Sequence, residues 1–361
     1  IYKDALFLSL MDTIVLKKDL SFLGILKKIF MSLLVRFKWQ FIFVLLMAIL
    51  AGGLQALTPK ILQQIIDLLL AGTTTAKAFY TLLPIYFLVY IGAAYFDFIT
   101  GRVVYYLATK IEDAWRFLAL NKYYQLPVIW HDQRESGEIG SRIDRAGTAI
   151  FSILSELFGH NIIVSFFTLF FILVLTFWQA PVIGIIFLVP LPLYALVTYV
   201  LSRKIAKGQA KLNKLMDRAQ RTLFDGCSNV RAVKAFGHEK QEVALYAKRW
   251  STYHNHDYGV EQLWLRQSIY QTTIEAMSRV FLLVFCVYSY MQGTLTVGQI
   301  VMFLTYQQLS FSPLTLLTYV FTRVRRLVKR AGQLFTIMAE DDPMADVDGA
   351  VNLPALRKHI Q

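Results

Sequence analysis

Titratable residues at helical spacing stand inside strongly apolar segments of this chain. Glu275 and Arg279 are four residues apart, and so are Glu156 and His160. Side chains four apart share one face of a helix, so one interpretation is an ion pair that tolerates burial. An ionisable group in hydrocarbon costs about 2.5 to 3.5 kcal/mol, so the other interpretation is a cavity that binds a polar ligand group. Gln271, one turn before Glu275, completes this candidate substrate cavity.

Motifs for catalysis are missing from the sequence. No glycine is followed by lysine, so there is no G-x-x-x-x-G-K-[ST] loop to hold the phosphates of a nucleotide. There is also no histidine cluster, no G-x-S-x-G motif and no paired motif of metal ligands. Cys227 stands in a polar stretch and Cys286 in an apolar one, which predicts two free thiols. We therefore expect no catalytic residue, metal or cofactor on the chain itself.

The composition is that of a membrane protein with several spans. Apolar residues make up 56% and aromatic residues 14% of the 361 residues, and the mean hydropathy is +0.48. These values are too apolar for a soluble protein of this length. A net charge of +13 would indicate nucleic acid for a soluble domain, but Lys and Arg fall in particular loops, as membrane topology requires. We therefore expect no nucleic acid among the partners.

Six segments are long and apolar enough to cross a bilayer as helices. They lie at about 39–57, 79–100, 157–178, 181–201, 269–291 and 297–321. The segment from Leu20 to Leu34 carries Lys27 and Lys28 and predicts an amphipathic helix on the membrane surface. Pro190 and Pro192 predict a kink in span four. Basic residues gather before span one and in the long connections, so both termini and both long connections are expected in the cytoplasm.

The two long connections are expected to be helical hairpins. No proline occurs between residues 85 and 126, so one helix would extend about 63 Å, twice the hydrocarbon thickness. In the second connection, apolar residues recur at helical spacing at Ile205, Leu212, Leu215 and Ala219. Breaker residues near the middle of each connection place the two hairpin tips at residues 130–142 and 236–241.

Four stretches of the chain resemble ATP-binding-cassette exporters. The long connections contain WHDQRESGEIGSRIDRAG and DGCSNVRAVKAFGHEKQE, which are similar to the first and second intracellular loops of these exporters. The stretch GTLTVGQIVMFLTYQQLSFSPL resembles their transition from span five to span six, and RAGQLFTIMAEDDP resembles the stretch before their nucleotide-binding domain. One departure is Asp225, which stands where these exporters usually have glutamate.

The resemblance implies an all-α membrane fold, a half-transporter of six spans with long cytoplasmic helical extensions. Its parts would be a cytoplasmic N-terminal segment with an interfacial helix at 1–35, the six spans at 36–335, and a linker toward a nucleotide-binding domain at 336–361. Two coupling helices would contact the nucleotide-binding domains. Motif positions assign to them Trp130, His131, Asp132, Ser136, Gly137, Glu138, Ile139, Arg142, Phe236, Gly237, His238 and Glu239.

The function expected from the resemblance is ATP-driven export by alternating access. The cargo would be a hydrophobic or amphipathic compound such as a drug or lipid, with a peptide as the next choice. ATP and Mg²⁺ would be bound by a nucleotide-binding domain, either fused downstream of Gln361 or carried by a separate chain. The expected location is the inner (plasma) membrane, with lipids and a second half-transporter as partners, most simply in a homodimer.

The alternative is a passive channel or a ligand-binding membrane receptor without ATPase. Six spans suit either of them. Neither class, however, calls for two charged helical hairpins of similar length on one side of the membrane.

Overall fold

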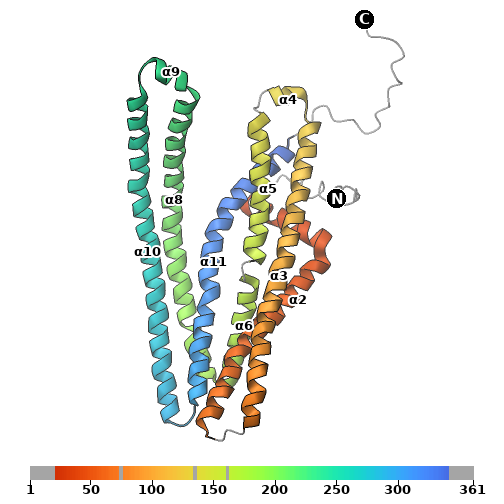
Figure 1. Cartoon of the computed structure of the whole chain (residues 1–361), viewed down its shortest axis with the longest axis vertical. Coiled ribbons are helices and arrows are strands. Elements are labelled where there is room, and N and C mark those ends of the chain that lie inside the picture. Colours follow the sequence, from red (N-terminus) through yellow and green to blue (C-terminus); the bar gives the residue numbers. More distant parts are fainter. Residues whose placement is uncertain (1–20, 73–75, 133–135, 160–161, 341–361) are drawn as a thin grey trace, which may run out of the picture. The chain divides into compact units, whose positions relative to one another are not determined.

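The computed structural model describes residues 21–72, 76–132, 136–159 and 162–340, and within them the chain is helical with short turns (Figure 1). No strand occurs in these ranges, which confirms the expected all-α fold. The helices are α2 (Phe22–Leu70), α3 (Ala76–Gln125), α4 (Val128–Asp132), α5 (Ser136–Phe158), α6 (Ile162–Gln179), α7 (Pro181–Leu188), α8 (Pro190–Ser228), α9 (Val230–Ala235), α10 (Glu239–Met291) and α11 (Val297–Met338).

Several helices are much longer than a bilayer is thick. Helices α3 and α10 contain 50 and 53 residues. At a rise of 1.5 Å per residue they extend about 75 to 80 Å, against a hydrocarbon core of about 30 Å. This confirms that the spans continue as helices well past their apolar segments.

Five stretches of helix in the described residues are long and apolar enough to cross a membrane. They lie in α2, in α3, in the α5–α6 segment, in the α7–α8 segment and in α10. The sixth predicted span, 297–321, lies in α11 and is not among these five. The count of six spans therefore stays a prediction for α11.

Span four is divided where its prolines predicted an interruption. Helix α7 ends at Leu188 and α8 begins at Pro190. Proline has no backbone N–H, so it breaks the hydrogen-bond ladder of a helix. Val189 between them keeps helical angles, with φ −59° and ψ −45°. The backbone therefore stays helical through this interruption, and a role of this point as a hinge stays a prediction.

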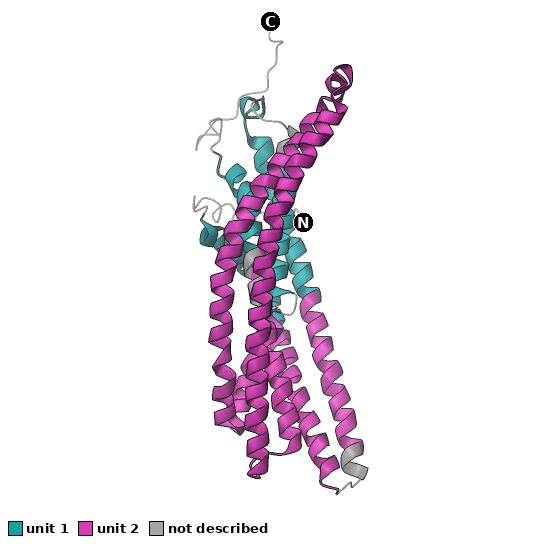
Figure 2. Cartoon of the chain, turned by 90° about the vertical axis from the view of Figure 1, so that its left-hand side faces the viewer, with its two compact units in different colours: residues 1–44, 102–160, 324–361 teal, residues 45–101, 161–323 magenta. Residues whose placement is uncertain are grey.

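The chain forms two compact units, which are described separately (Figure 2). The first comprises the described residues of 1–44, 102–160 and 324–361, and its core centres on Trp115 of α3, which is fully buried. Trp115 Nε1 donates a hydrogen bond to Ser32 Oγ of α2 at 3.3 Å. Its ring meets the Phe335 ring of α11 edge-on, with 4.8 Å between centroids. Three helices thus meet at one side chain.

The segment predicted to lie on the membrane surface forms the start of α2. A kink at Phe37, with φ −117° and ψ 29°, separates it from span one. Lys27 is exposed, as expected for a surface helix, but Lys28 is only 6% exposed. The Lys28 Nζ lies 5.2 Å from the centroid of the Phe335 ring, a cation–π contact. One face of this helix therefore packs into the first unit. The burial of Lys28 in that face was not predicted, because a basic side chain is expected to be exposed.

The second unit comprises 45–101 and the described residues of 161–323. Its largest buried cluster joins α2, α6, α7, α10 and α11 through Ala56, Ile172, Ile183, Phe187, Leu282, Cys286, Met302, Phe303 and Tyr306. Tyr306 Oη donates a hydrogen bond to the carbonyl oxygen of Ala56 at 2.8 Å, so this buried hydroxyl is satisfied. Both cysteines are free thiols, Cys227 exposed and Cys286 buried, as predicted.

Helices α8 and α10 pair along the second connection. Ile205, Leu212 and Val260 form a buried cluster between them, and Ala219 is also buried. Three of the four apolar positions predicted for this face are therefore buried, and Leu215 is partly buried. The predicted hairpin is confirmed.

The turn before α11 is capped from two directions. Thr296 Oγ1 accepts a hydrogen bond from the Gln299 backbone N–H at 3.1 Å, and Gln299 Oε1 accepts one from the Thr296 N–H at 2.8 Å. This reciprocal pair is a capping box. The Asp67 carboxylate of α2 accepts two further bonds, from Thr296 Oγ1 at 2.8 Å and from the Gly298 N–H at 2.9 Å. Asp67 therefore links the ends of α2 and α11.

Candidate functional site

The tip of the first hairpin is a tight turn followed by the short helix α4. The Trp130 N–H donates a hydrogen bond to the Pro127 carbonyl at 2.9 Å, which closes the turn. The Tyr123 ring of α3 contacts the rings of Trp130 and His131, with centroid distances of 6.1 Å and 4.6 Å. These predicted tip residues are therefore fixed against the end of α3, while Asp132 is exposed.

Two apolar residues that sequence reasoning missed are exposed beside them. Val128 and Ile129 are 72% and 67% exposed on α4. An exposed apolar pair on a short, well-fixed helix is typical of a protein contact surface.

The remaining predicted residues of the first tip belong to α5. Ser136, Gly137 and Glu138 form its first turn, and their side chains lie outside the described residues. Ile139 is 3% exposed and belongs to the packed face of α5. Arg142 is half-buried one turn further on. The structure therefore places these residues at the base of the tip, with α4 at its outer end.

Arg116 of α3 joins the two legs of the first hairpin. One of its terminal nitrogens, Nη2, lies 2.9 Å from Glu112 Oε1, 3.0 Å from Asp144 Oδ1 and 3.0 Å from Thr148 Oγ1. Gly147 lies directly under this side chain, and a Cβ there would collide with it. The motif that contains Asp144 was recognised from the sequence, but its partner Arg116 was not, because no local pattern connects residues 28 positions apart.

The tip of the second hairpin consists of α9 and the turn after it. His238 N–H donates to the Val233 carbonyl at 3.0 Å, and Gly237 N–H donates to the Lys234 carbonyl at 3.3 Å. These two bonds form a Schellman motif, in which the residue after the helix takes a left-handed conformation. Gly237 has φ +66° and fits this role because it lacks a Cβ. The predicted breaker therefore ends α9.

The sequence missed α9 itself. This short helix is Val230–Ala235, and Phe236 to His238 form the turn that follows it. The second coupling helix was predicted around 236–241, and that role stays a prediction. Asn229, a residue type that favours helix ends, was the available signal. Phe236 is 75% exposed, so the turn presents a large apolar side chain at the end of the hairpin.

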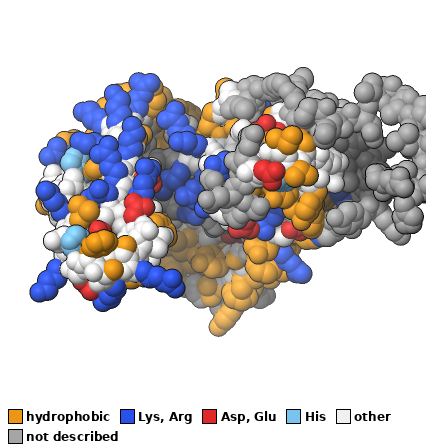
Figure 3. Space-filling model, turned by 90° about the horizontal axis from the view of Figure 1, so that it is seen from above, with side chains coloured by type: hydrophobic (Ala, Val, Ile, Leu, Met, Phe, Trp, Pro, Cys, Tyr) orange, Lys and Arg blue, Asp and Glu red, His pale blue; other side chains and the backbone are white. Residues whose placement is uncertain are grey.

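An ion pair joins residues on either side of Phe236 in the chain. Glu239 begins α10, and its Oε1 lies 3.1 Å from Lys234 Nζ. A hydrogen bond from its own backbone N–H and the bond and charge of Lys234 hold the pKa of the Glu239 carboxyl below its usual value. Figure 3 shows that Lys and Arg side chains gather over this end of the α8–α10 hairpin.

The candidate cavity residues of α10 lie together in the second unit. Arg279 Nη2 is 3.8 Å from Glu275 Oε1, and the two side chains are 45% and 36% exposed. Gln271 Nε2 donates to Thr198 Oγ1 of α8 at 2.7 Å, which links α10 to α8. Glu275 and Arg279 therefore form a self-neutralising pair that remains accessible.

The other two candidate cavity residues belong to the first unit. Glu156 is 1% exposed on α5, and His160 lies outside the described residues. Their predicted pairing is therefore untested. Within the described ranges, no group of three metal-binding side chains occurs.

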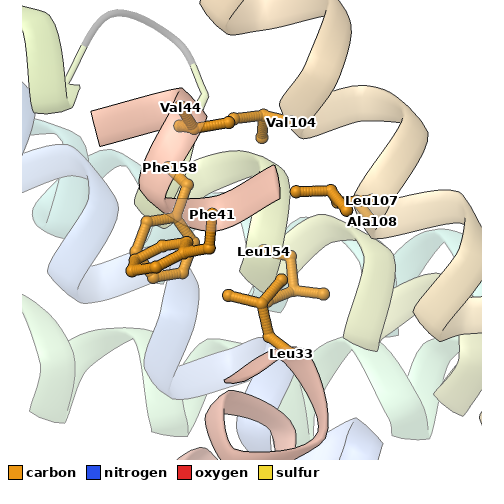
Figure 4. A pocket seen from close by; sticks show the side chains of 8 residues that line it. All are labelled: Leu33, Phe41, Val44, Val104, Leu107, Ala108, Leu154 and Phe158. Atoms are coloured by element: carbon orange, nitrogen blue, oxygen red, sulfur yellow. The ribbon is translucent and has the colours of Figure 1, made fainter. Parts of the chain in front are cut away.

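A small pocket in the first unit is lined by apolar side chains alone (Figure 4). It lies next to the kink of α2, between α2, α3 and α5, and its lining is Leu33, Phe41, Val44, Val104, Leu107, Ala108, Leu154 and Phe158. The rings of Phe41 and Phe158 meet edge-on at 5.3 Å. With no polar side chain in its lining, this pocket has no group for acid–base or nucleophilic chemistry.

Comparison with known proteins finds one family model and several related transporters. Residues 41–314 match the family model described as the ABC transporter transmembrane region. The chain is 30% identical over 253 residues to an ATM1-type heavy metal exporter of Novosphingobium aromaticivorans, a match covering 68% of this chain and 40% of the exporter. It is 25% identical over 258 residues to an ATP-dependent lipid A-core flippase of Pseudoalteromonas translucida, covering 70% of this chain and 43% of the flippase.

A solved structure shows the same fold. The structure of a bacterial Atm1-family ABC exporter with ATP bound superposes with a TM-score of 0.69 at 22% identity, covering 89% of this chain and 56% of that one. The chain thus spans about two-fifths of the length of the curated relatives it matches.

Proposed function

Because the chain belongs to the family of ABC transporter transmembrane regions, of the exporter type, we propose that it forms the membrane-spanning half of an ATP-driven exporter. In this proposal two half-transporters form a dimer in the inner membrane, and alternating access moves a compound out of the cytoplasm. ATP and Mg²⁺ bind to nucleotide-binding domains, and the chain transmits the resulting motion to its spans.

The observation that carries this proposal is the construction of the two hairpin tips. Each tip ends in a short helix fixed by its own hydrogen bonds or ring contacts, and each presents exposed apolar side chains, Ile129 on α4 and Phe236 after α9. An apolar anchor on a rigid support is what a protein interface needs to transmit force. These features support our proposal that the tips contact the nucleotide-binding domains.

We propose an amphipathic compound as cargo. The two relatives are named for a heavy metal and for lipid A-core, so the family alone does not fix the substrate class. The second unit offers the accessible Glu275–Arg279 pair within an apolar span, with the polar contact of Gln271 and Thr198 nearby. That combination suits a compound with both apolar and polar parts.

Coupling through the second tip is tested with the complete transporter, including its nucleotide-binding domains, in lipid vesicles. Phe236→Ser removes the exposed anchor, and we expect the ATP-dependent accumulation of a fluorescent amphiphile to fall at least tenfold. Tyr258→Ser is the matched control, because Tyr258 is 69% exposed on α10 but lies away from the tip. The control should transport normally.

Two results would contradict the proposal. Unchanged transport by Phe236→Ser would remove the second tip from the coupling contact. Equal accumulation of the amphiphile with and without ATP would favour the passive channel.

A further inference from the structure

Three phenylalanine rings stand at one side of the apolar pocket of the first unit. Phe41 and Phe158 line the pocket, and the Phe30 ring of α2 contacts both, with centroid distances of 5.8 Å and 5.9 Å. In Figure 4 the rings of Phe41 and Phe158 lie together, across the pocket from Leu107 and Ala108. Phe30 is 37% exposed and the other two rings are half-buried, whereas the remaining lining residues are buried. These rings, called the phenylalanine trio below, are therefore the part of the pocket wall that reaches the surface.

The pocket lies where α2 bends. Phe30 and Phe41 stand eleven residues apart, which is about 16 Å along a straight helix, yet their ring centroids are 5.8 Å apart across the kink at Phe37. The lining contains no polar side chain. A buried water needs two to four polar partners, so such a pocket does not hold ordered water. Empty space also leaves its lining without van der Waals contacts. An apolar group from outside the chain is therefore the occupant that suits this pocket.

Location and size favour the end of a lipid chain over a whole compound. The predicted span one begins at about residue 39, so Phe41 and Val44 belong to the first turns of that span. Acyl chains are the apolar groups that surround a span. Pockets for drug-sized compounds enclose about 300 to 1,000 Å³. This pocket encloses about 230 Å³ even when the space open to its surroundings is counted.

Basic side chains accompany the phenylalanine trio on α2. Lys27 stands one turn before Phe30 and Lys38 one turn before Phe41, and both lysines are exposed. Residues 21–66 contain no Asp or Glu, and in the described part of the chain no carboxylate pairs with either lysine. Long basic side chains at a membrane surface reach the headgroup layer, and each strengthens the attraction of anionic lipids about fivefold. The charge beside the pocket therefore complements an anionic headgroup.

We propose that this pocket binds the end of one acyl chain of an anionic phospholipid, whose headgroup is attracted by Lys27 and Lys38. The chain end enters past the phenylalanine trio and fills the space beside the kink of α2. All the residues of this lipid site belong to the first unit. The site therefore does not involve the Glu275–Arg279 pair of α10, and the proposal does not depend on the identity of the cargo.

The test measures lipid binding to the complete transporter in a non-ionic detergent. The transporter is titrated with dioleoyl phosphatidylglycerol, which is anionic, and with dioleoyl phosphatidylcholine, which has the same chains and no net charge. Native mass spectrometry gives the Kd of the first bound lipid. We expect this Kd to be about tenfold lower for phosphatidylglycerol. Glycerol phosphate, which carries the charge without a chain, should not bind.

Two kinds of variant separate the headgroup from the chain. Lys27→Gln/Lys38→Gln should raise the Kd for phosphatidylglycerol about tenfold and leave that for phosphatidylcholine unchanged. Lys211→Gln/Lys214→Gln, the matched control, removes two exposed lysines from α8 and should change neither Kd. Ala108→Leu fills the pocket and should weaken the binding of both lipids. Equal affinities of the unmodified transporter for the two lipids, equal losses in the two lysine variants, or normal lipid binding by Ala108→Leu would overturn the proposal.

A second measurement probes the pocket without filling it, in case Ala108→Leu does not fold. Phe158→Cys places a thiol at the surface side of the pocket, in a Cys227→Ser background that removes the exposed native thiol. Phosphatidylglycerol should slow the labelling of this thiol by N-ethylmaleimide several-fold, because an occupied pocket denies access to the reagent. Labelling that the lipid does not slow would overturn the proposal. Protection by rhodamine 123 alone would assign the pocket to a compound instead of a lipid.

Discussion

At the scale of single residues, Gly237 shows how one backbone conformation fixes the tip of the second hairpin. It ends α9 with φ +66° in a Schellman motif, and a Cβ added there would meet no atom within 4 Å. Any free-energy cost of replacing Gly237 must therefore come from its positive φ angle. A left-handed conformation costs a residue with a Cβ about 1 to 2 kcal/mol.

We predict that Gly237→Ala increases local opening of the second tip. A loss of about 1 kcal/mol corresponds to roughly fivefold faster hydrogen exchange at the amides of α9, measured by mass spectrometry. Gly259→Ala is the control, because a Cβ at Gly259 also meets nothing within 4 Å while its backbone is helical. That change should slow exchange in α10, since alanine favours a helix by about 0.5 to 1 kcal/mol. Similar effects of the two changes would refute the backbone argument.

At the scale of elements, the link between α2 and α11 depends on the short distance between the Asp67 carboxylate and the first turn of α11. Asp67 accepts bonds from Thr296 and Gly298, and a Cβ at Gly298 would collide with the Asp67 carboxylate and the Gln63 carbonyl. Loss of a cap costs about 1 kcal/mol, and overpacking costs about 1 to 3 kcal/mol.

We expect Asp67→Ala and Gly298→Ala each to lower the melting temperature in detergent. The double variant should lose less than the sum of the single losses, because both changes act on one contact. If the double variant lowers the melting temperature by the sum of the two single losses, the two residues act independently.

The same scale shows what the sequence could predict. The length of α3 beyond its apolar run followed from the absence of proline between residues 85 and 126, and the tips followed from Pro127 and Gly237. Helices α2 and α11 continue through Pro59 and Pro313, which the sequence did not predict. These signals are local. Arg116 with its partner Asp144, and Lys28 under Phe335, were missed because each contact joins residues far apart in the chain. The charge type of Lys28 even predicted exposure, whereas the ring of Phe335 makes its burial tolerable.

At the scale of the whole molecule, the two thiols can report on docking at the second tip. Cys227 is exposed on α8 three residues before α9, and Cys286 is buried in the core of the second unit. A maleimide should therefore label one thiol per folded chain and two after denaturation. If the nucleotide-binding domain covers the second tip, it should also cover Cys227.

We predict that labelling of Cys227 is several-fold slower in the complete transporter than in this chain expressed alone. Access to the thiol falls when a partner buries its surroundings, so the labelling rate measures occupancy of the tip. A Cys227→Ser variant gives the background rate. Equal rates with and without the nucleotide-binding domain would place the coupling contact elsewhere. Rapid labelling of Cys286 in the folded chain would mean instead that the core of the second unit opens. Maleimide labelling thus distinguishes two outcomes: fast labelling of Cys227 means that no partner covers the second tip, and fast labelling of Cys286 means that the core of the second unit opens.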